Sequence, residues 1–570
     1  MAGLKAKLAG PAILIPIIVL VILVPILKPG FFSVHDETHI VDVYEMYRSL
    51  EVGGFPPRFA PDFNFGIGYP YFNFYYHLPF YITSLFHFSG FSFVDSFKYM
   101  MGLAVIAAAA GFYLFLRNHV GKIPATMGTL IYLLSPYFAV DLYVRGAFGE
   151  LFIFALLPWA GFFLVNYIRK NSFTNLALAS LATALLALSH NVLHPFTFSI
   201  LFFYGLANML VFKKRPVEYL KIIWPFLIGL GLAAYYLLPA LLEVKFVSNY
   251  EQFNIADHFP FLKQLFIPHW GYGPSIWGYL DDISFDIGTV NLILVLISLF
   301  IFKSAKREAK ILMVFFWVVF GLAVALMNIR TLSFWESVRF LRLVQFPWRM
   351  LLLTTIATSF ISALVFEVVN EKYKKIFPVF FAVIIGLLLA LNIWHYHPSE
   401  YKEITDKQSL SLDERYLELY FANRTLAGER GYLSPEYLNF SEDFIPPTVW
   451  QKQRPGRILD EVGLASASGT VSFEKKGLDY DINYLLNQND KIIISKAYFP
   501  GWEAKSNSAT LEIEPYSQYG IIAINVPKGG GNIQLSFRNT PVRVLANSAS
   551  AVAGMFILVL LAYPVLRRKK

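Results

Sequence analysis

The sequence contains no cysteine and few charged residues. Without cysteine, the chain has no disulfides, no thiolate metal sites and no cysteine nucleophile. Lysine, arginine, aspartate and glutamate together make up 15% of the 570 residues, whereas roughly 25% is usual in a soluble domain. Hydrophobic residues make up 56%. A soluble chain of this size needs more polar surface, and the composition therefore indicates a polytopic membrane protein.

Several enzyme motifs are also missing. The sequence has no Walker A motif, no serine nucleophile elbow and no His-Glu-x-x-His zinc helix, which argues against ATP-driven transport and against serine or zinc hydrolases. The net charge is +9, but the basic residues do not gather into a patch. We therefore expect no nucleic-acid partner.

Twelve apolar stretches are long enough to cross the hydrocarbon core as helices. They cover residues 10–28, 94–116, 123–141, 150–168, 174–191, 195–212, 219–240, 287–303, 311–328, 348–368, 376–395 and 546–566. Short loops on one side, such as 117–122, 169–170 and 213–221, are rich in lysine and arginine. This positive-inside pattern predicts a multi-pass protein of the inner (plasma) membrane with both termini in the cytoplasm.

The predicted organisation has three parts. They are a transmembrane domain over 1–395 with a first outer loop over 29–93, an extracytoplasmic domain over 396–545, and a last transmembrane helix with a basic tail over 546–570. Apolar and polar residues alternate from about residue 465, which predicts an antiparallel β-sandwich. Gly529, Gly530 and Gly531 are expected to form a hairpin loop in it. Residues 396–450 have too few patterned strands for a fold to be assigned.

The first outer loop begins with two carboxylates. Asp36 and Glu37 follow the first apolar span and precede an expected helix over about 37–51. Ionisable side chains at the membrane surface are candidates for function. A carboxylate there takes a proton from an acceptor hydroxyl or holds a divalent cation; the alternative is that Asp36 caps the helix. His35 and His39 lie four residues apart, which adds a weak metal signal if the helix starts early.

Arginines at the predicted outer face are candidates for binding an anion. Arg145 and Glu150 lie in the short turn between spans three and four, where they either pair with each other or leave Arg145 to bind a phosphate. Four more arginines run against the positive-inside bias, namely Arg330, Arg339, Arg342 and Arg349. Phosphate binding and snorkelling to lipid phosphates both explain such positions. For Arg349, which begins a long span, we favour phosphate binding.

Further residues at the outer ends of spans complete the candidate pocket. His190 and Asn191 end the fifth span, His194 opens the sixth, and Glu243 ends the seventh. Each is either a pocket residue or an ordinary interfacial group. Four tyrosines of the first outer loop either stack on sugar rings or belong to an interfacial aromatic belt; they are Tyr69, Tyr71, Tyr75 and Tyr76.

The first outer loop resembles that of GT-C-type integral membrane glycosyltransferases, such as the aminoarabinose and protein O-mannosyl transferases. Their loop also begins with an Asp-Glu pair, followed by a helix, a Gly-containing turn and a Pro-rich aromatic stretch. Other segments resemble bacterial membrane proteins of the "6-pyruvoyl-tetrahydropterin synthase-related" family, which neighbours the YfhO-like proteins. These segments are LYVRGAFGELF (142–152), LSHNV (188–192), YYLLPALLE (235–243), VQFPWRML (344–351) and YFPGWEA (498–504). Nothing in the sequence matches the zinc-histidine site of a pterin synthase.

The resemblance implies a GT-C-like fold and a donor sugar carried on a polyprenyl phosphate. It places the catalytic role on Asp36, with Glu37 second, and any divalent metal (Mg or Mn) on the same two residues. The donor phosphate is expected on the outer-face arginines, which are Arg349, Arg145, Arg342 and Arg339. The other expected partners are the lipid bilayer and an extracytoplasmic glycan, lipid or protein acceptor.

Two functions stay open on the sequence. One is an inverting glycosyltransferase of cell-envelope glycan or glycolipid assembly. The other is a non-catalytic protein of the same fold that binds or translocates lipid-linked glycans. A third function, ion-coupled transport, requires ionisable residues in the middle of spans, and the sequence places few there.

Overall fold

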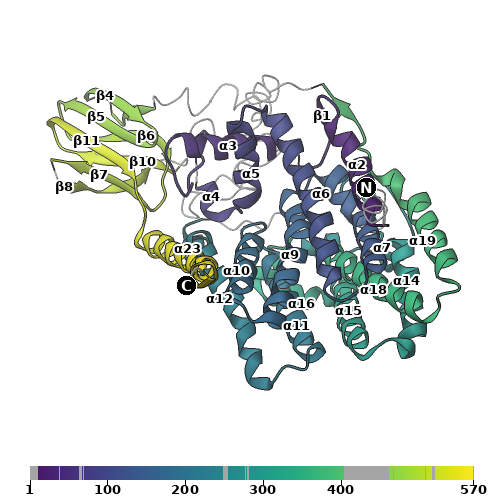
Figure 1. The fold of residues 1–570 in the computed structure, drawn as a ribbon. Coiled ribbons are helices and arrows are strands. Elements are labelled where there is room, and N and C mark those ends of the chain that lie inside the picture. Colours follow the sequence, from purple (N-terminus) through teal and green to yellow (C-terminus); the bar gives the residue numbers. More distant parts are fainter. Residues whose placement is uncertain are drawn as a thin grey trace.

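The computed structural model describes most of the chain as helices, with two β-sheets at one side (Figure 1). The described residues are 11–36, 39–62, 67–68, 70–247, 254–276, 278, 281–403, 461–466, 468–507, 509–516 and 520–568. Glu37, Tyr69 and most of 396–450 lie outside this part of the chain, so the expectations for them stay predictions.

Eight helical segments of the described chain are long and apolar enough to cross a membrane. They are α6 (Phe93–Arg117), α9 (Phe148–Lys170), α11 (His194–Val211), α12 (Ile223–Leu242) within Pro216–Phe246, α15 (Arg307–Leu326), α18 (Leu351–Lys372) within Pro347–Lys372, α19 (Phe377–Asn392) within Phe377–His395, and α23 (Pro541–Arg568). Three shorter apolar helices coincide with further predicted spans: α2 (Leu14–Leu27), α10 (Phe173–Ala187) and α14 (Thr289–Ile301). The membrane class is confirmed, while twelve crossings stays a prediction.

The third predicted span is broken rather than continuous. Helix α7 (Lys122–Leu133) is followed by α8 (Pro136–Ala139) and a π-helical segment, η2 (Val140–Arg145), with a bend of 52° between them. Proline at 136 has no backbone N–H and disfavours helical geometry in the residue before it, so the helix ends there. The predicted span over 123–141 is therefore present as a bent pair of helical segments, and its crossing of the membrane stays a prediction. Counted as one span, the bent pair is a ninth candidate crossing.

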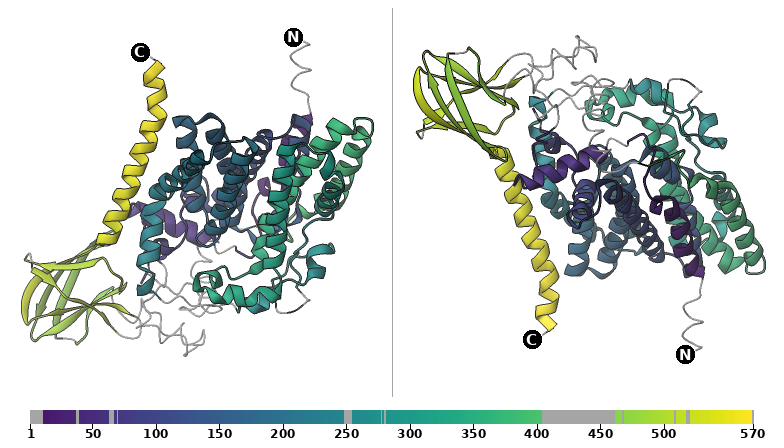
Figure 2. Two further views of the ribbon diagram at one scale, coloured as in Figure 1. Left: turned by 90° about the horizontal axis from the view of Figure 1, so that it is seen from below. Right: turned by 90° about the horizontal axis from the view of Figure 1, so that it is seen from above.

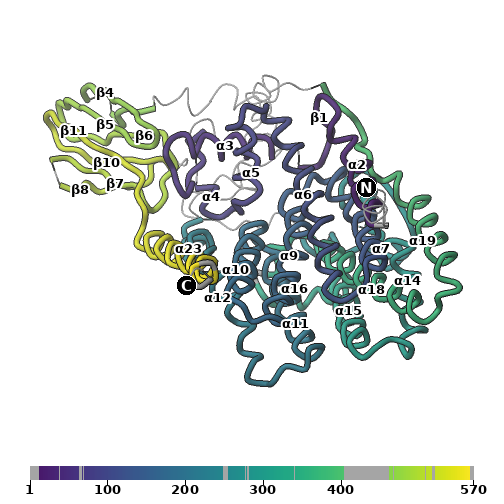
Figure 3. The backbone as a smooth tube through the Cα atoms, viewed as in Figure 1, coloured from purple at the N-terminus to yellow at the C-terminus, as the bar shows by residue number. Residues whose placement is uncertain are grey.

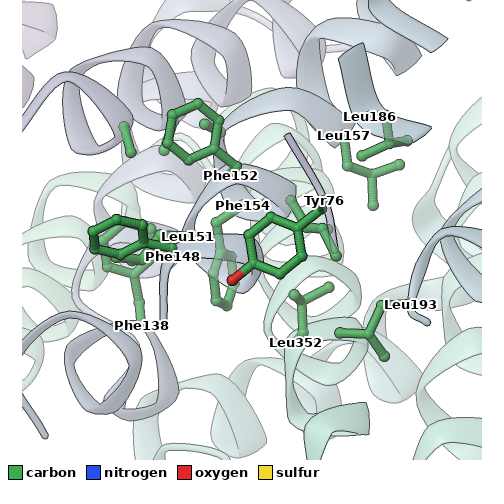
Figure 4. Packing of buried hydrophobic residues seen from close by; sticks show 14 of the residues in the cluster. Tyr76, Phe138, Phe148, Leu151, Phe152, Phe154, Leu157, Leu186, Leu193 and Leu352 are labelled. Atoms are coloured by element: carbon green, nitrogen blue, oxygen red, sulfur yellow. The ribbon is translucent and has the colours of Figure 1, made fainter. Parts of the chain in front are cut away.

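The helices divide into central and peripheral ones. Within its apolar window, 94% of the segment that contains α18 is buried, against 17% for α19 and α23. Several hydroxyls of α18 bond within the helix, as Thr354 does to Leu351 O and Ser362 to Thr358 O, and are satisfied without water, whereas the buried Ser359 hydroxyl has no hydrogen-bond partner among the described residues. Aromatic and leucine side chains of α9 pack beside Phe138, Tyr76 and Leu352 in the core (Figure 4).

Short elements connect the long helices. On the first outer loop these are β1 (Phe31–Phe32), α3 (His39–Glu51), α4 (Tyr71–Phe74) and α5 (Leu78–Phe88). Elsewhere they are η1 (Pro11–Ile13), η3 (Pro216–Ile222), η4 (Val244–Phe246), η5 (Ile255–His258), α13 (Leu262–Phe266), η6 (Phe302–Ser304), η7 (Ile329–Thr331), α16 (Leu332–Ser337), α17 (Arg339–Arg342), η8 (Pro347–Met350), η9 (Ile393–His395) and β2 (Tyr401–Lys402). Strand β1 pairs with β2 in an antiparallel register, Phe31 opposite Lys402.

The predicted antiparallel β structure before the last helix is confirmed. One sheet has the order β3-β6-β10-β9 and the other β4-β5-β11-β7-β8. The strands are β3 (Val462–Leu464), β4 (Gly469–Lys476), β5 (Asp479–Leu486), β6 (Asp490–Ala497), β7 (Trp502–Ser506), β8 (Ala509–Leu511), β9 (Ile513–Tyr516), β10 (Ile521–Val526) and β11 (Gly529–Phe537). The prediction of a hairpin loop at Gly529, Gly530 and Gly531 was wrong. These three glycines begin β11, where Gly529 pairs with Leu486 of β5.

The sheets pack against the first outer loop. Lys496 donates to Pro61 O at 3.0 Å, and the Ala497 N–H donates to Ile67 O at 3.1 Å. From β11 the chain leads directly into α23, which lies along the outside of the helical bundle (Figure 3). The start of α2 and the end of α23 lie at the same end of the bundle, opposite the sheets (Figure 2). The predicted placement of both termini in the cytoplasm stays a prediction.

Candidate functional site

A tight turn joins η2 to α9 and sets the positions of Arg145 and Glu150. Gly146 makes this turn in the left-handed conformation, at φ 65°, and a Cβ there would lie 2.7 Å from Val34 Cγ2. Glycine is therefore required both for the turn and for the close approach of the first outer loop. Arg145 ends one helical segment and Glu150 lies in the first turn of the next, where their charges complement the two helix dipoles.

Arg145 is the centre of a buried ion-pair network. Its Nη1 donates to Asp141 Oδ1 at 2.5 Å and to Glu150 Oε1 at 2.7 Å. The Tyr137 hydroxyl donates to Glu150 Oε2 at 2.6 Å. Arg349 Nε lies 3.2 Å from Glu150 Oε1. We call these five residues, Tyr137, Asp141, Arg145, Glu150 and Arg349, the Arg145 cluster. The predicted pairing of Arg145 with Glu150 is thus present.

Asp141 Oδ2 has no hydrogen-bond donor among the described residues, and Arg349 is the cation of the cluster with spare hydrogen-bonding capacity. Its Nη1 donates to Val344 O at 3.0 Å, and its Nη2 reaches Gln345 Oε1 at 3.4 Å. The contact of its Nε with Glu150 lacks hydrogen-bond alignment, so this N–H has no hydrogen-bond acceptor among the described residues. The side chain is 11% exposed, against 6% for Arg145. Arg145 lies over the ring of Trp348, next to Arg349, with 4.7 Å between Cζ and the ring centroid.

Asp36 is held against the Arg145 cluster by its backbone. The Asp36 N–H donates to Arg145 O at 2.8 Å, and the His35 N–H donates to Val144 O at 2.9 Å. The Asp36 carboxylate is half-buried and makes no hydrogen bond or ion pair with any described residue, although its charge acts on Arg145 and Tyr76. It caps no N–H of the described part of α3. The side chain is therefore available to an incoming group.

His190 and Tyr76 form the apolar wall beside these charges. Their rings stack at 5.6 Å, and a Cβ at Gly149 would lie 2.6 Å from His190 Cδ2. His190 Nδ1 accepts from the N–H of Val192 at 3.2 Å, which leaves the proton on Nε2. Burial, together with the charges of Arg349, Arg145 and neighbouring histidines, holds the pKa of His190 well below its usual value. The ring is neutral and donates through Nε2.

The two histidines of the first outer loop have separate partners. His35 precedes the helix and its Nε2 bonds to Tyr272 O at 2.7 Å, whereas His39 Nδ1 bonds to Asp42 Oδ2 at 2.9 Å inside α3. Within the described residues, no group of three or more histidine or acidic side chains is placed to hold a metal. A metal held by Asp36 and Glu37 stays a prediction, because Glu37 is outside the described part.

The remaining candidates lie apart from the Arg145 cluster or are undefined. Glu243 belongs to a different buried group, in which it accepts from Arg543 Nε at 3.0 Å and from Asn73 Nδ2 at 2.8 Å. Asn191 is half-buried beside His190. Arg339 and Arg342 are on α17, the former without a described side chain and the latter half-buried. Arg330 is exposed on η7.

Three members of the site were not found from the sequence. Asp141 is fully buried and lies one helical turn before Arg145. The spacing of four residues between a carboxylate and an arginine in an apolar run could have predicted this ion pair from the sequence. Tyr137 and Trp348 gave no such signal, because their roles depend on contacts between separate helices.

Comparisons with known proteins confirm the family resemblance for part of the chain. Residues 72–345 match the model of the family described as "6-pyruvoyl-tetrahydropterin synthase related domain; membrane protein". None of the curated proteins matches the sequence.

Two solved structures of the arabinofuranosyltransferase AftD from Mycobacteria are similar to the chain. The first has a TM-score of 0.49 and 12% identity and covers 72% of this chain and 28% of AftD. The second, a mutant of AftD, has a TM-score of 0.44 and 14% identity and covers 71% and 30%. The chain thus spans less than a third of the length of that enzyme.

Proposed function

We propose that this protein is an inverting glycosyltransferase of the membrane, which moves a sugar from a polyprenyl-phosphate donor to an extracytoplasmic acceptor in envelope assembly. One observation carries the proposal. Asp36, whose carboxylate has no partner among the described residues, is fixed by its own backbone to Arg145, and the network of Arg145 includes an arginine with a spare N–H, Arg349. The GT-C resemblance of the first outer loop supports the same assignment.

Asp36 acts as the general base. Its carboxylate takes the proton of an acceptor hydroxyl while that oxygen attacks the anomeric carbon of the donor sugar. The bond between the anomeric carbon and the phosphate oxygen breaks, and its electron pair leaves with the polyprenyl phosphate. One displacement inverts the anomeric centre.

Arg349 and Arg145 stabilise the leaving phosphate. A guanidinium group stays protonated and matches phosphate oxygens in geometry. Arg349 contributes its unsatisfied Nε–H, while Asp141 and Glu150 hold Arg145 in place. His190 Nε2 adds a neutral donor beside them. Because a lipid phosphate already leaves readily, positioning and charge stabilisation supply most of the lowering of the barrier.

The test is transfer of radiolabelled sugar by purified protein in lipid. The donors are undecaprenyl-phosphate-linked sugars, and the acceptors are an envelope extract of the host. We expect Asp36→Asn to lower the transfer rate by about 10²- to 10⁴-fold, as for loss of a general base, and to leave donor binding nearly unchanged. Arg330→Gln, a change at an exposed arginine of the same face, is the control and should transfer at the wild-type rate.

The possible outcomes separate the proposal from its alternative. Label transferred by wild type and Arg330→Gln, but not by Asp36→Asn, supports catalysis by Asp36. If wild type binds the donor and no form transfers label, a protein that binds or translocates lipid-linked glycans is the better description. Equal transfer by wild type and Asp36→Asn would remove Asp36 from the reaction.

A further inference from the structure

A second buried group of charged residues lies where the first outer loop meets α12 and α23. We call it the Arg58 cluster, and it consists of Arg58, Asn73, Glu243, Thr540, Arg543 and Asn547. Arg58, Glu243 and Arg543 are 5%, 2% and 0% exposed. The proposed transfer reaction uses none of these residues, so the cluster needs its own explanation.

Glu243 has its hydrogen-bonding capacity taken up within the cluster. Its Oε2 accepts from Arg543 Nε at 3.0 Å and from Asn73 Nδ2 at 2.8 Å, and its Oε1 accepts from the Thr540 hydroxyl at 2.5 Å. Arg543 also donates to Pro500 O at 2.8 Å. The pair of Glu243 with Arg543 is thus complete without Arg58.

Arg58 is left with donors that the protein does not use. Its Nη2 donates to Asn547 Oδ1 at 3.0 Å. Its Nε and Nη1 are buried, and the described residues supply neither a hydrogen-bond acceptor for them nor an ion-pair partner. A buried donor without an acceptor is costly and rare in a folded protein.

The cluster also carries an uncompensated positive charge. Two guanidinium groups face one carboxylate among the described residues that act on Arg58. Burial and the charge of Arg543 lower the pKa of Arg58 to about 10, so the group remains charged at neutral pH. A buried charge without a counterion is unstable, and an anion at this place would remove the imbalance and accept from the free N–H groups.

The position of the cluster favours a lipid as the source of the anion. Asn547 lies on α23, whose neighbours Val544 and Leu545 are exposed apolar residues. Tyr235 of α12 and Tyr81 of α5 also act on Arg58. Arg543, near the start of α23, pairs with Glu243 just after the end of α12, so the cluster lies where these two helices reach the predicted outer face, at the level of outer-leaflet head groups.

We propose that the Arg58 cluster binds a phosphate group, separate from the donor phosphate of the Arg145 cluster, and that a lipid head group of the outer leaflet supplies it. The bound phosphate holds the first outer loop, α12 and α23 together. The site does not depend on the proposed transfer reaction, because it contains none of the residues that carry it.

The test measures lipid binding by the full-length protein, purified in neutral detergent and stripped of lipid. Phosphatidylglycerol, phosphatidylcholine and inorganic phosphate are added separately, and the Tm is measured for each. Wild type should gain several degrees with phosphatidylglycerol. Arg58→Met should lose this gain, whereas Arg48→Met should keep it, because Arg48 is paired with Asp62 at 2.9 Å on the same loop.

Each outcome decides the proposal. A gain with inorganic phosphate that Arg58→Met abolishes supports a phosphate site filled without a lipid; a gain with phosphatidylglycerol alone supports the lipid head group. Equal gains in wild type and Arg58→Met overturn the site and leave Arg58 as a structural arginine solvated by internal water. If Arg58→Met does not fold, native mass spectrometry of wild type decides: no retained phosphate-bearing species, with no change in Tm, overturns the proposal.

Discussion

The Arg145 cluster and the Arg58 cluster use the same side chains with different balances of charge. In the first, two arginines face Asp141 and Glu150. In the second, Arg543 pairs with Glu243, and Arg58 has no ion-pair partner among the described residues. A balanced network is stable without ligand and positions its groups for chemistry, whereas a network with excess charge needs an outside anion. The comparison is the basis for proposing transfer at the Arg145 cluster and a permanently bound phosphate at the Arg58 cluster.

Removing one carboxylate from each cluster should have the largest effect on stability. Glu243→Gln leaves two buried arginines with no carboxylate, and we expect a loss of about 3–5 kcal/mol. Glu150→Gln leaves Asp141 to pair with Arg145, so its loss should be smaller. Thermal unfolding in detergent measures both. Equal losses would show that the balance of charge does not distinguish the clusters.

Arg349 should affect transfer and have little effect on stability. Arg349→Gln removes the spare N–H and the charge at the donor phosphate, and the transfer rate should fall by about 10²- to 10³-fold, as for loss of a preorganised donor at a developing charge. Arg58→Met is the matched change in the other cluster and should leave the transfer rate of folded protein within a few-fold of wild type. A comparable fall in the transfer rates of Arg349→Gln and Arg58→Met would indicate that the two clusters form one functional site.

His190, which lies beside the Arg145 cluster, should make the stability of the protein fall at acidic pH. The fold holds the pKa of His190 well below its usual value, so below about pH 6.5 the unfolded chain binds a proton that the folded chain does not. Stability should therefore fall as the pH drops from 7.5 to 5.5, and His190→Gln should make this fall shallower. Tm values at both pH values test it, with His269→Gln, at an exposed position, as the control. An unchanged slope in His190→Gln would contradict the neutral ring.

Exposed ion pairs should have the smallest effect. Arg48 pairs with Asp62 and Glu51, but its side chain is 33% exposed. Solvent screens such a pair, and we expect Arg48→Gln to cost about 0–1 kcal/mol. Unfolding of this variant beside Glu243→Gln measures the contrast. A loss of stability as large as that of Glu243→Gln would mean that burial does not explain the contribution of the Arg58 cluster to stability.

Local pattern was enough to predict the classes of element. Long apolar runs located helices such as α6 and α9 because a helix in lipid needs a continuous apolar surface. Alternating residues located β11, in which Ile533 and Leu535 are buried and Gln534 between them is exposed. The expected helix over 37–51 is present as α3, His39–Glu51. The bend at Pro136 and the strand position of Gly529 were missed, because each depends on what the neighbouring segments do.

The sequence by itself determined that the chain is a membrane protein with a β-sheet region and which outer-face residues were candidates, because hydropathy and alternation are local properties. Only the tertiary structure decided that Asp36, Arg145 and Arg349 meet while Glu243 pairs with Arg543. Those contacts join residues up to 300 positions apart. The packing of the helices determines which arginine pairs with which carboxylate. Each buried charge needs a partner, because an unpaired buried charge is strongly destabilising.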